Sequence, residues 1–413
     1  MGYLLQNGGL GMAGDWIITG GRPLQGRVEV PAAKNSVLPL LAAALLCSGP
    51  VRLQNVPRLT DVEDCLALLR GVGCTAGWQG AALAVQGQPM RTDLAPEAAG
   101  RMRASILFCA PLLARLGRVN TVLPGGCRIG ARPIDLHLQG LAQMGVRQLP
   151  AAPGQLTLYA PAGLRGAEIC LAFPSVGATE TLLLAAATAQ GQTVLHGAAK
   201  EPEIADLAAF LNVCGGCVEG AGTDTIRVQG RRCLAGCTFA PMADRIIAST
   251  LACAVAAAGG RVELAGCAPG LYAPLLEILE QMGCTVERAN DAAAISRFGA
   301  LRGAGNVHTA PYPGLATDAA PLLAAVMLCA QGESSLQDRV FENRFACAVG
   351  FAALGANVRV AERTLYVQPA GALHGAKLTA PDLRGGAALV VAALAARGSS
   401  RLDGVELVRR GYA

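Results

Sequence analysis

The sequence has 413 residues, of which 52% are apolar and only 4% aromatic, and its formal net charge is +5. A chain of this length exceeds the size at which a single hydrophobic core stops growing, so we expect two domains. The apolar content excludes an intrinsically disordered chain, and basic residues scattered singly argue against a nucleic-acid-binding protein.

Fifteen cysteines occur at irregular spacing, together with only four histidines. This composition favours neither a disulfide framework nor a zinc cluster, and it indicates the cytosol. Residues 1–16 lack the basic flank of a signal peptide and are interpreted as a ragged leader. Apolar runs at 36–49, 246–260 and 385–398 are shorter than the roughly 18 residues of a membrane span, so they predict buried helices.

One pattern recurs along the chain. A run of small residues typical of a helix is followed by a glycine, and then by alternating apolar and polar residues typical of a strand. The glycines that mark this repeat are Gly49, Gly117, Gly191, Gly260, Gly332 and Gly398. A second marker is a helix that ends in glycine before another strand, and it occurs at Gly73, Gly145, Gly215, Gly283 and Gly355. The two series predict six units of strands and two helices, three per domain. We expect the glycines to cap the C-termini of the helices. We also expect parallel crossovers to bury these helices against the sheets.

The sixth unit is shorter than the others in this sequence. A sixth copy of the second marker would fall beyond the last residue, so the final repeat lacks one helix and one strand. We therefore expect an uncovered sheet edge in the last unit, and fraying at Arg410. The alternative fold is a doubly wound sheet without repeats.

Stretches along nearly the whole chain resemble the UDP-N-acetylglucosamine enolpyruvyl transferases. They include AAKNSVLPLLAAALL, LPGGCRIGARPIDLHLQGL, FPSVGATET, YPGLATD, VFENRF and RGY, and they extend from about Gly20 to Tyr412. The resemblance implies an α/β enolpyruvyl-transferase fold of two inside-out domains, each of three repeats, with the last repeat truncated. It places one domain at 34–241, and the other, with both termini, at 1–33 plus 242–413.

The reaction that the resemblance implies is transfer of the enolpyruvyl group from phosphoenolpyruvate to the 3-hydroxyl of UDP-N-acetylglucosamine, with release of phosphate. This is the first committed step of peptidoglycan precursor synthesis, and it is inhibited by fosfomycin. The resemblance further implies a cytoplasmic enzyme, commonly monomeric, that requires no metal or organic cofactor. Neither nucleic acid nor membrane insertion is expected.

Two residues are expected to handle protons. Cys127 stands beside Arg128 and Arg132 in a glycine-rich segment, where the positive field would lower the pKa of its thiol. By resemblance, Cys127 is the general acid that fosfomycin alkylates, on a loop that closes over the site. Asp318 is the carboxylate that takes the proton of the sugar hydroxyl. The alternatives are an ordinary loop cysteine and an aspartate that caps a helix.

Phosphoenolpyruvate carries a phosphate and a carboxylate, so its site needs several fixed cations. The residues that the resemblance assigns to this site are Lys34, Arg103, Arg132, Arg344, Arg384 and Arg410. Of these, Lys34 is also expected to be catalytic. To the nucleotide sugar it assigns Asn35, Arg103, Arg132, Pro133, Ile134, Asp135, Leu136, Ser175, Val176, Gly177, Asp318 and Val340. Structural support is expected from His137, Glu201 and Glu203.

Several residues near the expected site depart from the family pattern. Ala32 replaces a glycine at the domain hinge, Ala319 and Ala320 replace the residues that usually follow the aspartate, and Ile247 stands where a buried glutamate is usual. These departures leave two alternatives, a non-catalytic UDP-sugar-binding paralogue and an enolpyruvyl transferase that uses a different acceptor. The shikimate-pathway enolpyruvyl transferases share the architecture but lack the cysteine loop.

Overall fold

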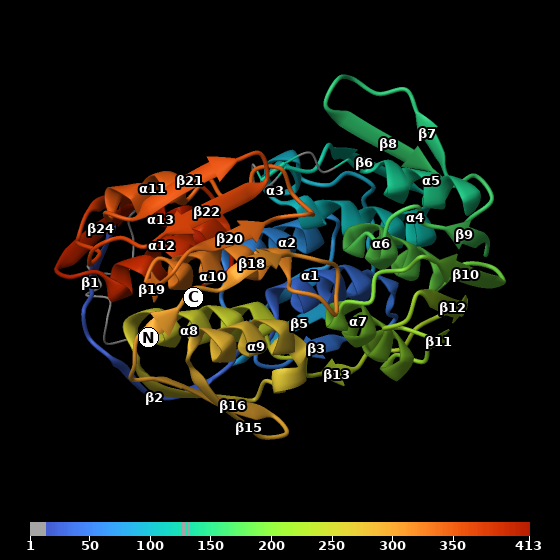
Figure 1. Ribbon diagram of the computed structural model, residues 1–413. Helices are drawn as coiled ribbons and strands as arrows, with labels where there is room; N and C mark the ends of the chain where they lie inside the picture. The colour runs from blue at the N-terminus through green and yellow to red at the C-terminus, as the bar shows by residue number, and fades with distance from the viewer. Residues whose placement is uncertain (1–13, 126–128, 131–132) are drawn as a thin grey trace. The chain divides into compact units, whose positions relative to one another are not determined.

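The computed structural model describes residues 14–125, 129–130 and 133–413, so the predicted site residues Cys127 and Arg132 lie outside the described part. The chain divides into two compact units (Figure 1). Unit 1 comprises residues 14–31, 129–130 and 243–413, and unit 2 comprises residues 32–125 and 133–242.

The helices of unit 2 are α1 (Lys34–Ala43), α2 (Thr60–Gly71), α3 (Pro96–Arg101), α4 (Cys109–Leu116), α5 (Asp135–Gln143), α6 (Val176–Ala186) and α7 (Pro202–Val213), with 3-10 turns η1 (Ala44–Leu46) and η2 (Arg103–Phe108). Its strands are β3 (Val51–Leu53), β4 (Thr75–Gln79), β5 (Ala82–Gln86), β6 (Arg118–Val122), β7 (Arg147–Leu149), β8 (Gln155–Tyr159), β9 (Glu168–Cys170), β10 (Gln192–His196), β11 (Val218–Glu219), β12 (Thr225–Gln229) and β13 (Thr238–Phe239).

The helices of unit 1 are α8 (Arg245–Ala258), α9 (Ala273–Met282), α10 (Ala320–Met327), α11 (Ala348–Ala353), α12 (Leu383–Ala395) and α13 (Val405–Val408), with 3-10 turns η3 (Pro269–Tyr272) and η4 (Thr317–Ala319). Its strands are β1 (Trp16–Thr19), β2 (Leu24–Glu29), β14 (Gly260–Ala265), β15 (Thr285–Arg288), β16 (Ala292–Arg297), β17 (Leu301–Arg302), β18 (Gly305–His308), β19 (Ala330–Gln331), β20 (Ser334–Gln337), β21 (Asn357–Ala361), β22 (Thr364–Gln368), β23 (Lys377–Thr379) and β24 (Ser399–Asp403).

One strand order recurs in both units, which confirms the repeat architecture. The sheets β9-β10-β12-β11 and β13-β3-β5-β4 of unit 2 have the same order as β2-β14-β16-β15 and β18-β20-β22-β21 of unit 1. In each of these sheets the first pair is parallel and the others are antiparallel. In the pairs β9-β10 and β18-β20, a parallel crossover contains one helix, α6 or α10, and in all four sheets a second helix is followed by the antiparallel hairpin.

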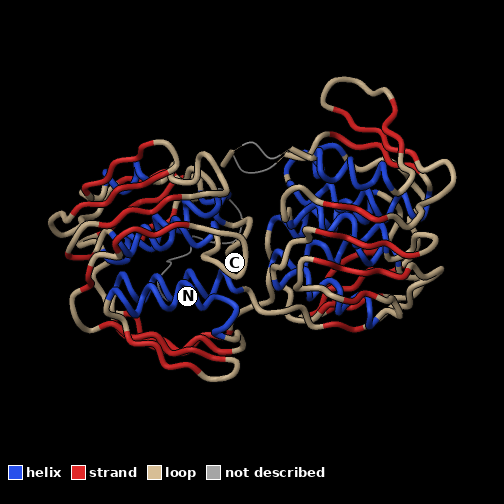
Figure 2. Tube along the Cα trace, turned by 45° about the vertical axis from the view of Figure 1, so that its right-hand side comes forward, coloured by secondary structure: helices blue, strands red, loops and turns tan. Residues whose placement is uncertain are grey.

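Helices fill the middle of each unit, and sheets surround them (Figure 2). In unit 1, α8, α10 and α12 pack on one another, and every residue of α10 is buried. A helix that is apolar on all faces has to be surrounded by protein. The inside-out arrangement therefore explains why the apolar runs of the sequence are buried helices.

All the marker glycines except Gly49 have positive φ, a backbone conformation that other residues rarely adopt. All five glycines of the second series have positive φ, between 88° and 111°. Gly117 and Gly283 are the C-caps of α4 and α9, as predicted, whereas the other markers lie up to a few residues beyond their helices. The repeat therefore depends on left-handed turns that glycine makes at low cost.

A further glycine repeat was not among the sequence markers. The segments LRGAEI, LAGCTF, LRGAGN and LHGAKL precede the parallel edge strands, and their glycines are Gly166, Gly236, Gly303 and Gly375. A Cβ at these positions would lie 2.1, 2.2, 2.6 and 2.1 Å from a backbone oxygen of the neighbouring segment. Only glycine allows this close approach.

The end of the chain differs from expectation. Strand β24 lies between β23 and β1, which pairs with it antiparallel from Trp16↔Leu402 to Thr19↔Ser399. The prediction that the last unit exposes this edge is therefore wrong, because the N-terminal strand covers it. The expected fraying is also not observed, because Tyr412 is 7% exposed and its N–H bonds the Val408 carbonyl at 3.1 Å.

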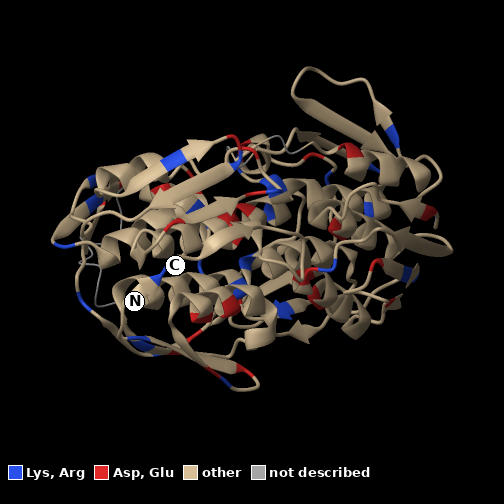
Figure 3. Cartoon of the chain, in the orientation of Figure 1, with Lys and Arg blue, Asp and Glu red and all other residues tan. Residues whose placement is uncertain are grey.

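Within the described residues, every helix is too short or too polar to cross a membrane. Acidic and basic residues are interspersed along the chain in both units (Figure 3).

We predict that Gly375→Ala lowers the melting temperature of the protein by several degrees, because the new Cβ would lie 2.1 Å from the Ser399 carbonyl oxygen. Such overpacking costs about 1–3 kcal/mol. Thermal unfolding followed by circular dichroism measures the change. The matched control is Gly371→Ala, where nothing lies within 4 Å of the new Cβ; equal melting temperatures of the two variants would contradict the prediction.

Candidate active site

Two buried arginines hold the carboxylate of Asp318 in unit 1. Its Oδ1 accepts a hydrogen bond from Arg344 Nη2 at 3.0 Å, and its Oδ2 accepts one from Arg384 Nε at 3.1 Å. The arginine side chains are 1% and 5% exposed, whereas 27% of the Asp318 side chain is exposed. The carboxylate is thus fixed in orientation, yet a hydroxyl group can still reach it.

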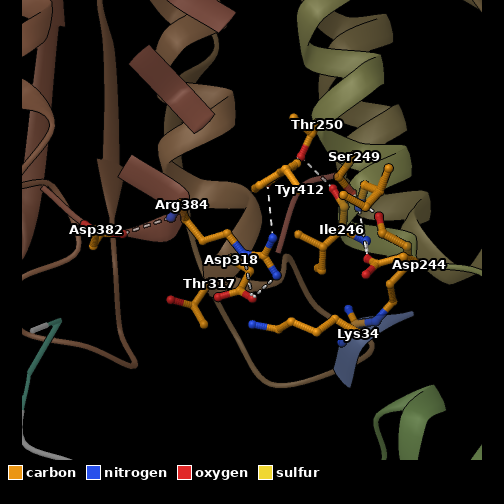
Figure 4. Close-up of polar contacts among 12 residues, drawn as sticks. Lys34, Asp244, Ile246, Ser249, Thr250, Thr317, Asp318, Asp382, Arg384 and Tyr412 are labelled. Carbon is orange, nitrogen blue, oxygen red and sulfur yellow. Dashed lines mark hydrogen bonds and ion pairs between the residues drawn. The ribbon is translucent and has the colours of Figure 1, made fainter. Parts of the chain in front are cut away.

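Arg384 is held at the start of α12 by groups on three segments (Figure 4). Asp382 caps the helix by accepting hydrogen bonds from the N–H groups of Arg384 and Gly385, both at 3.0 Å. The Tyr412 hydroxyl accepts from Arg384 Nη1 at 3.1 Å and lies 2.9 Å from Thr250 Oγ1. The guanidinium is therefore oriented by residues far apart in the sequence.

The charge state of Arg384 follows from these neighbours. Burial alone would lower its pKa, but the nearby oxygens of Tyr412, Asp318 and Asp244 outweigh that effect, and the pKa is raised. Burial also raises the pKa of Tyr412, against the opposing effect of Arg384. Arg384 is therefore a permanent buried cation, and Tyr412 acts as a neutral hydroxyl.

Arg344 has its own set of partners. Its Nε donates to Thr317 Oγ1 at 3.0 Å and lies 3.7 Å from Asp338 Oδ2. Asp338, which is 0% exposed, also accepts hydrogen bonds from the N–H groups of Val340 and Phe341 at 2.8 and 2.7 Å. One buried carboxylate therefore orients both the arginine and the turn that carries Val340.

In unit 2, Lys34 is the first residue of α1. Its Nζ lies 3.1 Å from Asp61 Oδ2, and the two side chains are 10% and 4% exposed. The following residue, Asn35, is half-buried, and the Ser36 hydroxyl bonds the Asp206 carboxylate of α7. The start of α1 thus presents a lysine whose charge is balanced and whose position is fixed.

Apart from Asn35 in α1 and Arg103 in η2, the predicted nucleotide-sugar residues of unit 2 lie at the starts of α5 and α6. Arg103 Nη2 donates to the Pro133 carbonyl at 2.9 Å, just before Ile134, Asp135 and Leu136 begin α5. At the start of α6, Ser175 is the N-cap and its Oγ accepts from Ala178 N at 3.4 Å. His137 of α5 packs close to the start of α6, because a Cβ added at Gly177 would lie 3.0 Å from its Nε2.

Glu180, in the middle of α6, is buried and lies near two other acidic side chains. Burial, and then repulsion from Glu203 and Glu201, raise the pKa of Glu180 well above its usual value of 4.5. Because a protonated Glu180 carries no charge, it does not weaken the partial positive charge at the N-terminus of α6. Glu203, expected as structural support, is 3% exposed on α7.

The predicted residues fall into two sets. Lys34, Asn35, Arg103, Pro133, Ile134, Asp135, Leu136, Ser175, Val176 and Gly177 lie in unit 2, and Asp318, Val340, Arg344, Arg384 and Arg410 lie in unit 1. Cys127 and Arg132 lie outside the described residues.

The structure corrects two expectations and adds residues. Asp318 does not cap a helix, because the N-cap of η4 is Ala316 and the Asp318 carboxylate bonds arginines instead. Ile247 is half-buried, so its position is not the fully buried one expected of the usual glutamate. The residues that sequence analysis missed are Asp61, Thr250, Thr317, Asp338 and Tyr412. Two of them, Thr317 in YPGLATD and Tyr412 in RGY, stand in motifs that carried the resemblance, and these motifs could have pointed to them.

The flanks of the Cys127 segment are tightly packed. A Cβ at Gly125 would lie 1.6 Å from the Gly100 carbonyl oxygen, and one at Gly130 would lie 2.1 Å from Glu342 Oε2. Gly130 also has φ of 146°. Glycine is therefore required on both sides of the segment.

Among the described residues, no group of three or more His, Cys, Asp or Glu side chains has an arrangement that could hold a metal ion.

Comparisons with known proteins cover nearly the whole chain. The family model described as EPSP synthase (3-phosphoshikimate 1-carboxyvinyltransferase) matches residues 18–413. The chain is 42% identical over 397 residues to the UDP-N-acetylglucosamine 1-carboxyvinyltransferase of Nitratidesulfovibrio vulgaris strain Hildenborough, covering 96% of this chain and 94% of that protein. It is 43% identical over 399 residues to the protein of the same name from Maricaulis maris, with coverage of 96% and 94%.

Solved structures show the same fold. The enolpyruvyl transferase NikO from Streptomyces tendae is similar with a TM-score of 0.85 and 26% identity, over 97% of this chain and 95% of that one. An EPSP synthase from Acinetobacter baumannii has a TM-score of 0.73 and 19% identity, over 95% and 94% of the two chains.

We predict that Glu180→Gln weakens the pH dependence of stability. Above the usual pKa of 4.5, folded Glu180 keeps a proton that the unfolded chain releases, so stability falls as pH rises towards the folded-state pKa. Glutamine is neutral at every pH, so this decline should become shallower. Melting temperatures between about pH 5 and about pH 8 measure the slope.

The control for this prediction is Glu219→Gln, at an exposed position of the same unit. Equal slopes for wild type, Glu180→Gln and Glu219→Gln would mean that Glu180 is not held neutral by its surroundings.

Proposed function

Because the chain belongs to the EPSP synthase family of 1-carboxyvinyltransferases, we propose that it transfers the enolpyruvyl group of phosphoenolpyruvate to the 3-hydroxyl of UDP-N-acetylglucosamine and releases phosphate. The acceptor is inferred from the relatives that are 42% and 43% identical over nearly their full length, because they carry that name. The similarity to EPSP synthase at 19% identity supports the fold alone.

The observation that carries the proposal is the carboxylate of Asp318, fixed between Arg344 and Arg384 with 27% of its side chain exposed. A hydroxyl nucleophile needs a positioned base within hydrogen-bond reach, and anionic substrates need fixed cations. The cluster of Asp318, Arg344 and Arg384 supplies both the base and the cations. It also lies on rigid elements, the η4 turn and the start of α12.

In the proposed addition step, Asp318 accepts the proton of the sugar 3-hydroxyl while the hydroxyl oxygen bonds to C2 of phosphoenolpyruvate. Cys127 donates a proton to C3, which becomes a methyl group in a tetrahedral ketal. In the elimination step, C3 returns a proton to the Cys127 thiolate, the bond from C2 to the phosphate oxygen breaks, and the departing phosphate takes the proton held by Asp318. The products are inorganic phosphate and the enolpyruvyl ether of the nucleotide sugar.

We propose that the anionic groups of phosphoenolpyruvate bind Arg344, Arg384 and Arg410 of unit 1 and Lys34 and Arg103 of unit 2, with Arg132. Guanidinium groups suit this role because they grip carboxylate and phosphate oxygens with paired donors. The buried partners of Lys34 and Arg384 support it, because they hold the cations in place before substrate arrives.

The nucleotide diphosphate is proposed to bind at the N-terminus of α6, at Ser175, Val176 and Gly177. Helix N-termini offer unpaired N–H groups and a partial positive charge to such anions. Burial of Glu180 in its neutral form supports this assignment, because a carboxylate there would oppose the anion. The uridine is assigned to Pro133, Ile134, Asp135 and Leu136, and the sugar to Asn35 and Val340.

The proposed activity is the first committed step of peptidoglycan precursor synthesis and places the enzyme in the cytoplasm, where both substrates are available. Fosfomycin is expected to inactivate it by alkylating the Cys127 thiol.

The test is phosphate release by the purified chain with both substrates. We predict turnover by the wild type and a loss of about 10²–10⁴-fold in kcat for Asp318→Asn, the usual contribution of a general base. The matched control is Asp403→Asn, also in unit 1, whose side chain is 29% exposed and pairs with Lys377 and Arg401. It should retain wild-type turnover. Cys127→Ala should lose turnover as well.

Binding of UDP-N-acetylglucosamine by calorimetry separates the alternatives. A wild type that binds the nucleotide sugar without releasing phosphate would contradict the proposal and favour a binding protein. Phosphate release that is equal in wild type and Asp318→Asn would remove Asp318 from the mechanism.

A further inference from the structure

Three cysteines in unit 2 bring their sulfur atoms into contact. The Sγ of Cys214 lies 3.3 Å from that of Cys237 and 3.8 Å from that of Cys47. Cys47 and Cys214 are each 1% exposed, whereas Cys237 is half-buried. The proposed transferase reaction uses none of these thiols.

Backbone hydrogen bonds fix the three segments that carry the thiols. Cys214 is the C-cap of α7, and its carbonyl accepts from Ala235 N at 2.8 Å. Cys47 follows η1 and bridges Leu234, and the Cys237 carbonyl accepts from Arg52 N of β3 at 2.8 Å. The proximity of the sulfurs is therefore imposed by the fold and does not depend on flexible side chains alone.

Cys237 is half-buried and is one of the residues that line a cavity of about 660 Å³ beside the sheet β13-β3-β5-β4. Its lining includes Cys237, Arg52, Thr75, Gly77 and Gln86. A small reagent can therefore approach Cys237, and the arginine favours one that carries negative charge. Cys47 and Cys214 are almost fully buried, so such a reagent would reach Cys237 first.

We propose that Cys214 and Cys237 form a reversible intramolecular disulfide when the protein meets a small disulfide oxidant such as oxidised glutathione. The Cys237 thiolate attacks one sulfur of the oxidant and releases the first small thiol. The Cys214 thiolate then attacks the Cys237 sulfur of the mixed disulfide and releases the second. Two protein thiols lose two electrons and two protons, and the oxidant becomes two thiols.

The geometry favours this pair over the alternatives. A disulfide has a bond length of about 2.05 Å, so the sulfurs at 3.3 Å need to close by roughly 1.2 Å. Cys47 is farther from Cys214 and too buried to meet an oxidant first. Cys214 and Cys217 form a Cys-x-x-Cys pattern in the sequence, yet the thiol contacts of Cys214 are to Cys237 and Cys47.

The reaction is expected to be slow at neutral pH. Burial raises the pKa of Cys237 to about 12, and the hydrogen bond with Cys47, together with burial, raises the pKa of Cys214 further. Thiolate is the attacking species, so both steps use a small fraction of the thiols. Long incubation at mildly alkaline pH is therefore the appropriate condition.

The test uses the full chain, first reduced and then incubated with oxidised glutathione. Remaining thiols are blocked with iodoacetamide, and the protein is digested without reduction for peptide mapping by mass spectrometry. We expect a peptide linked between Cys214 and Cys237 in the wild type and in Cys170→Ser, a control at an exposed cysteine of the same unit. In Cys214→Ser, glutathione should remain attached to Cys237.

The disulfide would close a loop between the end of α7 and β13, so it should raise the melting temperature by ~5 °C, reversibly with dithiothreitol. The Cys237→Ser variant should show no such rise. A wild type that links Cys214 to Cys217 or to Cys47, or that modifies exposed cysteines without forming the internal link, would overturn the proposal. These outcomes do not depend on transferase activity, because none of them measures turnover.

Discussion

The pairing of buried arginines with Asp318 is the interaction on which the candidate site depends. Two guanidinium groups, on Arg344 and Arg384, lie among apolar helices with side-chain exposures of 1% and 5%. A charge in such surroundings is tolerated only when it is paired and fully hydrogen-bonded, and removal of one partner costs about 3–5 kcal/mol. Asp318, Asp338, Thr317 and Tyr412 meet that requirement. The ion pairs that allow these arginines to be buried also hold the Asp318 carboxylate in one orientation.

The repeat architecture explains why these groups can gather. Candidate residues stand at the start of an inner helix or of the 3-10 turn that precedes one, in repeat after repeat. They are Lys34, Arg103, Val176, Asp318 and Arg384, and Arg245 stands at the corresponding position of α8, so that the six positions are 66 to 73 residues apart. Each inner helix presents its unpaired N–H groups at that end, where anions are favoured. One repeated feature of the backbone thus places several candidate anion-binding residues at helix starts within each unit.

The sequence predicted the repeats and the motif residues, because glycines at left-handed turns and charged residues before apolar runs leave clear patterns. It did not predict how the chain closes. Strand β1 covers β24 although nearly four hundred residues separate them, and no local pattern announces that pairing. The hydroxyl of Tyr412 on Arg384 and the sulfur contacts of Cys214 are likewise long-range contacts. Asp318 was expected as a helix cap or a base, and only the side-chain geometry shows that arginines hold it.

The most direct test of the Asp318 cluster is the steady-state kinetics of Tyr412→Phe with phosphoenolpyruvate as the varied substrate. The substitution removes only the hydroxyl that accepts from Arg384 Nη1. One hydrogen bond to a charged group contributes about 1.5 kcal/mol, so kcat/KM should fall about tenfold. Tyr366→Phe, at a position 38% exposed, should be unchanged. A Tyr412→Phe enzyme with wild-type kcat/KM would contradict the claim that this network positions the arginines for catalysis.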